Sequence, residues 1–208
     1  MSLVMPKEGG DFELVPAGSF IATCYRVIDL GTQQYEYQGV TKRSKKLMIS
    51  WELTEEKMKD GRPFSIHKNY NLSSSKKATL RIDLEAWRGV PFTEADFGSF
   101  DVSKLLGKSC FIGVVHTKSG DNQYANISSI LRLPKGMDAL PLVNDKVQFD
   151  LDDFDQMIYD SLSESLRAKI AKSPEYQELK GGHVGEPNTV NDSGHEPNHP
   201  AFDSDIPF

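Results

Sequence analysis

Positively charged and aromatic residues are interleaved between residues 35 and 81, and together they could bind a strand of nucleic acid. Cations neutralise backbone phosphates, and aromatic rings offer faces on which unpaired bases stack, at about 1–3 kcal/mol per base. The candidate DNA-binding residues are Tyr35, Tyr37, Lys42, Arg43, Lys45, Lys46, Lys68, Tyr70, Lys76, Lys77 and Arg81. Tyr35 and Tyr37 stand in a polar stretch, where stacking or a hydrogen bond to their own backbone would account for them. Tyr70 fits either the site or the core.

The last six residues, Asp203 to Phe208, form a second candidate binding element. Ile206, Pro207 and Phe208 could fill an apolar pocket on a partner. Asp203, Asp205 and the terminal carboxylate would then meet basic residues around that pocket. The preceding stretch is rich in Gly, Pro, Asn and His, so residues 181–208 are expected to be a disordered tail that carries this tip.

The string Asp-x-Asp-Ile-Pro-Phe resembles the acidic tip of bacterial single-stranded-DNA-binding proteins. The resemblance implies an OB-fold body that coats single-stranded DNA and a tip that recruits replication and repair enzymes. The helical connection in the body is longer than in typical members, and residues 147–180 have no counterpart there. A bacteriophage-type protein with a host-like tip fits better, and a monomer or dimer is favoured over the tetramer of the family.

Charge is distributed unevenly along the 208 residues, whose net charge is −6. Residues 1–136 contain 19 Lys and Arg against 15 Asp and Glu, whereas residues 137–208 contain 5 against 15. A mildly basic body followed by an acidic segment suits a phosphate-binding domain with a partner-binding tail, because cations are needed only at the DNA surface.

The apolar pattern predicts a mainly β protein with five strands. Alternating apolar residues place these strands at 19–29, around 47–53, and at 63–72, 109–117 and 123–133. A polar loop is expected from Gly31 to Ser44, with Trp51 and Phe64 in the core. Three strands, a helical connection and two strands is the order of an OB-fold barrel, and five strands closed into a barrel leave no exposed edge.

A helix of about 12 residues is expected between strands 3 and 4. Leu80, Leu84 and Trp87 recur at helical spacing, Ser73–Ser75 offer N-caps, and Gly89 offers a stop. A strand from residue 78 to 84 is the alternative. A second, short helix is expected from Asp101 to Gly107.

Beyond the barrel, residues Val147 to Leu151 alternate as an added strand would, and two short helices should follow. Ser161 with Glu164 fits a capping box for the first, and Ser173-Pro174 fits the start of the second.

Four parts are therefore expected along the chain. They are a flexible arm at 1–17, an OB-fold DNA-binding domain at 18–136, an acidic appendage with short helices at 137–180 and the tail at 181–208.

Catalytic and metal-binding constellations are not apparent in the sequence, so no enzyme activity, metal or cofactor is expected. Cys24, Cys110, His67 and His116 lack the local ligand pair that nucleates a zinc site. Both Cys lie in apolar runs and fit buried thiols of a reducing compartment. Neither a signal peptide nor an apolar run of membrane-spanning length is seen, which favours a soluble, cytoplasmic protein.

The expected function is non-catalytic binding and protection of single-stranded DNA in replication, recombination or repair, with the tip recruiting partner proteins. The alternative is an adaptor or inhibitor that docks on host repair enzymes through the tip without binding DNA.

Overall fold

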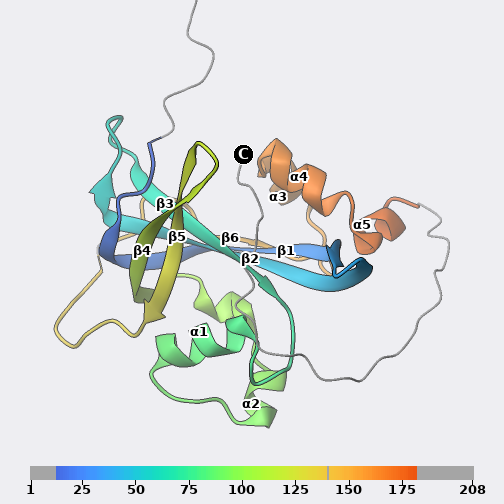
Figure 1. Ribbon diagram of the computed structural model, residues 1–208, viewed down its shortest axis with the longest axis horizontal. Helices are drawn as coiled ribbons and strands as arrows, with labels where there is room; N and C mark the ends of the chain where they lie inside the picture. Colours follow the sequence, from blue (N-terminus) through green and yellow to red (C-terminus); the bar gives the residue numbers. More distant parts are fainter. Residues whose placement is uncertain (1–12, 140, 182–208) are drawn as a thin grey trace, which may run out of the picture.

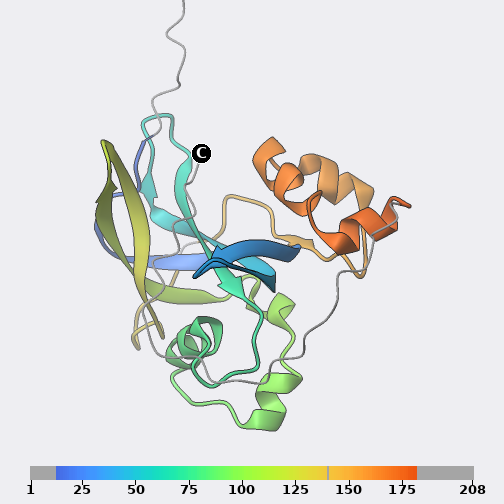
Figure 2. The ribbon, with the colours of Figure 1, turned by 45° about the vertical axis from the view of Figure 1, so that its right-hand side comes forward.

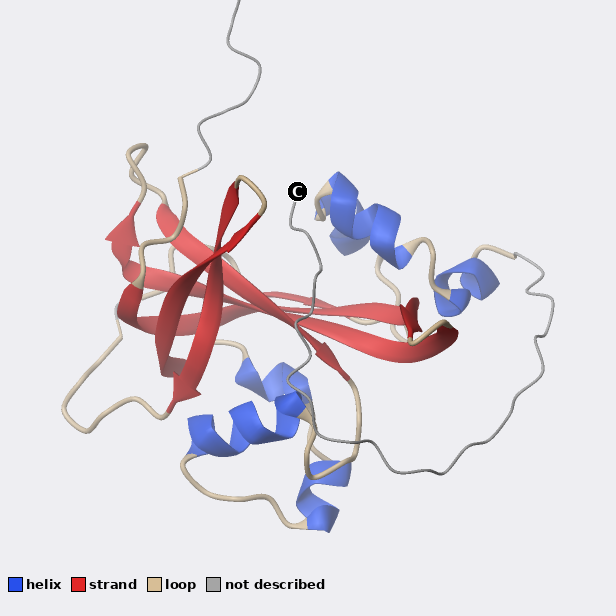
Figure 3. Cartoon of the chain, in the orientation of Figure 1, coloured by secondary structure: helices blue, strands red, loops and turns tan. Residues whose placement is uncertain are grey.

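The computed structural model describes residues 13–139 and 141–181. The protein is mainly β, with one sheet and short helices on both sides of it (Figures 1 and 3). The strands run in the order β3-β2-β1-β4-β5, with all these neighbours antiparallel, and β6 pairs with β1 in parallel. The strands are β1 (Gly18–Tyr37), β2 (Val40–Lys57), β3 (Pro63–Asn71), β4 (Ser109–Ser119), β5 (Asn122–Leu131) and β6 (Val147–Phe149). The helices are α1 (Thr79–Arg88), α2 (Glu94–Gly98), the 3₁₀ helix η1 (Val102–Leu105), α3 (Gln156–Ser161), α4 (Glu164–Ile170) and α5 (Pro174–Leu179).

The hydrogen-bonded sheet is open, so the closed five-stranded barrel expected from the sequence is not formed. In the described part of the chain the edge strands β3 and β5 contact each other without a ladder between them. The ladder between β3 and β5 is missing because helix α1 packs against both of these edge strands. Just past β5, the Arg132 N–H donates to the carbonyl of Ala86 in α1 (3.1 Å).

Two separate cores lie on opposite faces of the sheet, as Figures 1 and 2 show by the positions of the helices. On the inner face, which is covered by α1, alternate residues of β2 such as Ile49 and Trp51 pack with Leu84 and Trp87. The outer face carries α3–α5. There Ile28 and other residues of β1 and β2 pack with residues of β6 and these helices. The sheet is therefore covered on both faces along part of β1 and β2.

The polar segment 31–44 is an extended hairpin, so the prediction of a loop there is wrong. β1 and β2 continue as a two-stranded arm to a turn at Gln38 and Gly39, whose φ angles are 52° and 75°. Two positive φ values are typical of the type I′ turn, whose twist matches paired strands. Tyr37 pairs with Val40 beside the turn.

The helical connection is confirmed with a later start than expected. Leu80, Leu84 and Trp87 are buried, and Gly89 ends α1 in the left-handed conformation. The N-cap is Ala78, without a side-chain hydrogen bond, so the Ser caps are wrong. The short helix after Asp101 is confirmed as the 3₁₀ turn η1. The sequence analysis missed α2.

The segment after the sheet also follows the expected order, with one cap displaced. β6 is confirmed, and Ser173 caps α5 with Pro174 in its first turn. The expected cap Ser161 instead lies in the last turn of α3, a helix that was not predicted, and Ser163 caps α4.

Candidate nucleic-acid interface

Strand alternation divides the basic run of β2 between the two faces of the arm. Tyr35 pairs with Lys42, and Gly31, which faces the helices, pairs with Lys46. Residues in register or two positions apart share a face. One face therefore carries the residues that we call the outer arm face: Tyr35, Tyr37, Lys42 and Lys46. Arg43 and Lys45 lie on the opposite face.

On the outer arm face each tyrosine ring has an ammonium group beside it. The Nζ atom of Lys42 lies 4.8 Å from the centroid of the Tyr37 ring, and that of Lys46 lies 5.7 Å from the Tyr35 ring. Tyr37 is 43% exposed, whereas Lys46 is only 8% exposed. Cation–π attraction of about 0.5–1 kcal/mol holds such pairs together. An exposed aromatic ring thus lies next to an exposed cation at Tyr37 and Lys42, whereas Lys46 beside Tyr35 is buried.

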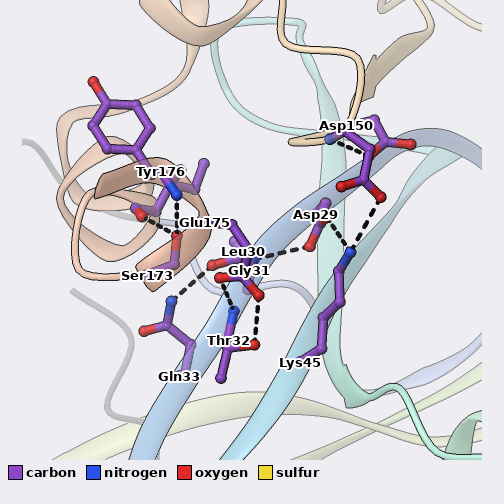
Figure 4. A network of polar contacts seen from close by, with 12 residues as sticks. Asp29, Leu30, Gly31, Thr32, Gln33, Lys45, Asp150, Ser173, Glu175 and Tyr176 are labelled. Atoms are coloured by element: carbon purple, nitrogen blue, oxygen red, sulfur yellow. Dashed lines mark hydrogen bonds and ion pairs between the residues drawn. The ribbon is translucent and has the colours of Figure 1, made fainter. Parts of the chain in front are cut away.

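The two cations of the opposite face have protein partners. The Lys45 ammonium lies 3.1 Å from Asp29, as Figure 4 shows, and 3.6 Å from Asp152. Burial opposes the charge of Lys45, but these carboxylates raise the pKa of its ammonium. Burial raises the pKa of the Asp29 carboxyl. The Arg43 guanidinium lies beside the Gln34 amide and donates to its oxygen, at 2.9 and 3.2 Å, when the amide is turned so that the oxygen faces Arg43. Lys45 is thus held in an ion pair, not presented to a ligand.

Lys68 and Tyr70 share the carboxylate of Asp83 as a hydrogen-bond partner. Tyr70 is 3% exposed, and its hydroxyl donates to Asp83 (2.9 Å). Lys68 donates to the same carboxylate oxygen (2.7 Å). Burial and the nearby carboxylate raise the pKa of Tyr70 well above its ordinary value. The Tyr70 ring presents no face to a base, so its selection as a stacking residue is corrected: it belongs to the core.

The remaining candidates lie on the loop into α1 and on α1 itself, away from the outer arm face. Arg81 is buried and joins α1 to the segment that follows, with Glu85 at 3.0 Å, Glu94 at 3.1 Å and the Phe92 carbonyl at 2.9 Å. These contacts make it a structural residue. Lys76 pairs with Glu94 (3.3 Å), and Lys77 is exposed.

The outer face of the sheet continues beyond the arm and carries two cationic or titratable residues that the sequence analysis did not select. These are Arg26 on β1 and His67 on β3, both in register with Ser50 of β2. The one feature of the sequence that could have pointed to these residues is Arg26, which interrupts an otherwise apolar strand. It follows a bulge between Cys24 and Arg26 that shifts the alternation of β1.

Helices α4 and α5 hold the base of the arm in place (Figure 4). Glu175 accepts hydrogen bonds from the Thr32 N–H (2.9 Å) and hydroxyl (2.6 Å). The Gln33 amide donates to the carbonyls of Leu30 (2.7 Å) and Lys169 (3.1 Å). These contacts satisfy the edge of β1 just beyond the residues that pair with β6, so the arm leaves the sheet from a fixed base.

Replacing Glu175 by Gln should therefore lower stability in a pH-dependent way. Burial opposes ionisation of Glu175, but the Thr32 hydrogen bonds outweigh it and lower the pKa of the carboxyl. A lowered pKa contributes stability above the unfolded value of about 4.3, and that contribution is lost as pH falls through the folded pKa. Urea unfolding should show Glu175→Gln less stable by about 1 kcal/mol at pH 7, after allowance for partial exposure.

The same comparison at pH 3 should show little difference between the two proteins. A deficit that is equal at pH 3 and pH 7 would contradict a charged Glu175 at this contact. Glu178→Gln, on an exposed residue of the same helix, is the matched control.

The described residues offer few metal-binding or reactive groups besides the arm. Within residues 13–139 and 141–181, no group of three or more His, Cys, Asp or Glu is arranged to hold a metal ion. Burial raises the pKa of the Cys24 thiol to about 12 and that of Cys110 well above its ordinary value. No helix in these ranges is long and apolar enough to cross a bilayer.

One pocket in the described ranges, with a volume of about 230 Å³, is lined by no charged side chain. Its lining is Leu72, Ser73, Ser74, Leu80, Leu84, Phe97, Gly98, Phe100 and Val102.

Fold and site together define a mainly β protein with a projecting arm, one face of which pairs tyrosines with lysines. No protein-family model matches the chain, and a search of curated proteins also finds no match. The tip residues Asp203, Asp205, Ile206, Pro207 and Phe208 lie outside the described residues.

Proposed function

We propose that this protein binds single-stranded DNA without catalysis and without strong sequence preference, through the outer arm face. The observation that carries the proposal is the placement of Tyr35, Tyr37, Lys42 and Lys46 on one face of a two-stranded arm. Stacking accepts any base and cations contact only phosphate, so this set of groups binds strands of any sequence. The biological setting would be replication, recombination or repair.

The strand order supports an OB-fold reading of the body. Three strands, a helix and two strands follow one another, and the edges β3 and β5 contact each other as in a partly open barrel. In OB-folds that bind oligonucleotides, the ligand crosses strands 2 and 3 and contacts the connection between strands 1 and 2. The arm is that connection here, lengthened into a ribbon.

Fluorescence titration with a labelled oligo-dT at several salt concentrations tests the proposal. Micromolar or tighter affinity that falls steeply with salt is the expected result, because each phosphate contact releases counterions. Absence of binding at low salt would overturn the proposal and favour an adaptor whose body binds protein. Turnover of the labelled strand that depends on divalent metal would point to an enzyme.

We also propose that the tip recruits replication and repair proteins, a proposal that rests on the sequence alone. Deleting residues 203–208 should leave oligo-dT affinity unchanged or slightly higher at low salt, because it removes negative charge that competes with phosphate. Pull-down from bacterial extract should lose the captured replication and repair enzymes. Equal capture by the full chain and the deletion variant would show that the tip is not the docking element.

A further inference from the structure

A row of residues crosses the outer face of the sheet at a distance from the arm. Arg26 of β1 is in register with Ser50 of β2, which is in register with His67 of β3. Side chains in register on neighbouring strands stand about 5 Å apart at Cβ and point to the same side. A guanidinium, a hydroxyl and an imidazole are thus set side by side.

Helix α4 packs against β1. The carbonyl of Lys169 accepts a hydrogen bond from Gln33 (3.1 Å), and the charge of Lys169 acts on His67. His67 is exposed at the surface, but desolvation by the surrounding protein and the positive charges of Lys169 and Arg26 lower the pKa of its imidazole. Strand register therefore places a guanidinium from β1 and an imidazole from β3 on the same face of the sheet.

Two polar atoms in or beside the row are buried and lack a hydrogen-bond partner in the described structure. One is Nε of Arg26, and the other is Oδ1 of Asn69, two residues from His67 on the same face of β3. Buried polar atoms are nearly always paired, and an unpaired one costs about 1–3 kcal/mol. The Arg26 nitrogen is a donor that needs an acceptor, whereas the Asn69 oxygen is an acceptor that needs a donor.

One carboxylate on the same face of β2 is bound to the linker before β6. Glu52, two residues from Ser50 on β2, is fully buried. It accepts hydrogen bonds at 2.9 Å from the backbone of Val143 and Asn144, and one at 2.6 Å from the Asn144 side chain. Its charge therefore stabilises the linker before β6.

We propose that Arg26 and His67 form an anion site that takes a backbone phosphate of bound DNA. The strand would run from the outer arm face along β3, past Asn71, which is in register with Lys46, and past Asn69 to this site. Beside this path Ile28 and Met48 are buried beneath the helices. The inference rests on the proposed function and adds to it the direction of the strand and the contacts beyond the arm.

Titration of oligo-dT binding against salt tests the site with three single variants. Arg26→Gln and His67→Gln should each weaken binding, Arg26→Gln by roughly fivefold at low salt with the slope of log affinity against log salt reduced by about 0.7. Lys104→Gln removes the same charge from an exposed residue of η1, which packs against the core on the inner face of the sheet, and should change neither quantity. Unfolding curves for each variant check that the fold is kept.

Nuclear magnetic resonance of the His67 ring gives a second readout, with His67→Gln to assign its signal. A phosphate beside the imidazole favours its charged form, so oligo-dT should raise the pKa of His67 from its depressed value. Arg26 and Lys169 are the charged groups that act on this ring, and both remain in the complex. If the wild type binds DNA but the His67 titration and the Arg26→Gln slope are unchanged, the site is overturned and the proposed function stands. If the wild type does not bind, both fail.

Discussion

Replacing Tyr35 and Tyr37 together by alanine should weaken oligo-dT binding by about 2–6 kcal/mol, because each ring is proposed to stack one base at about 1–3 kcal/mol. Both rings lie on the outer arm face, and neither belongs to either hydrophobic core. The loss should therefore appear in affinity with little change in the free energy of unfolding. Parallel fluorescence titrations and urea unfolding curves measure the two quantities.

Phenylalanine at the same two positions is the matched control. Phe keeps the ring and the cation–π contact with Lys42 or Lys46 while removing only the hydroxyl. Affinity should stay within about threefold of the wild type, since stacking uses the ring. Equal losses for the Phe and Ala variants would show that the hydroxyls matter, and no loss for Ala would remove the tyrosines from the site.

Gly31→Ala should destabilise the protein by about 3 kcal/mol, the largest expected effect of a single substitution on folding. Gly31 has a φ of +67°, and an added Cβ would overlap the side chain of Ser173. Ser173 is fully buried and its hydroxyl donates to the Ile170 carbonyl (2.7 Å), so it has no room to move. Helices α4 and α5 would have to shift from β1.

Gly39→Ala separates the cost of a positive φ from the cost of the overlap with Ser173. Gly39 has a φ of +75° in the arm turn but no atom within 4 Å of an added Cβ. It should therefore show only the backbone cost, about 1–2 kcal/mol. Urea unfolding of both variants gives the comparison. Equal destabilisation would mean that α5 does not pack on Gly31 as described.

Local patterns in the sequence were sufficient for the core and for most elements. Trp51 and Phe64 were placed in the core by alternation with apolar residues, and both are buried. Tyr70 follows Phe64 and Ile66 at the same period of two. Lys68 interrupted that apolar pattern, and its partner Asp83 lies in a helix that no strand pattern could have connected to it.

The arm and the second core were beyond local patterns. Most residues of the arm are polar and its outer half is exposed, so alternation of apolar residues gives no signal and a loop was predicted. The ion pair of Lys45 with Asp152 joins residues from β2 and the segment after β6. Such contacts depend on how the helices pack on β1, which the sequence does not encode in any single stretch.

The most direct test of DNA binding by the outer arm face compares two double variants with the same change in charge. Lys42→Gln with Lys46→Gln alters the outer arm face, and Arg43→Gln with Lys45→Gln alters the opposite face. Salt-dependent oligo-dT titration should show the slope of log affinity against log salt reduced by about 1.4 for the first pair, from roughly 0.7 per lost contact, and nearly unchanged for the second. Equal effects of the two pairs, or a larger effect of the second, would contradict the account.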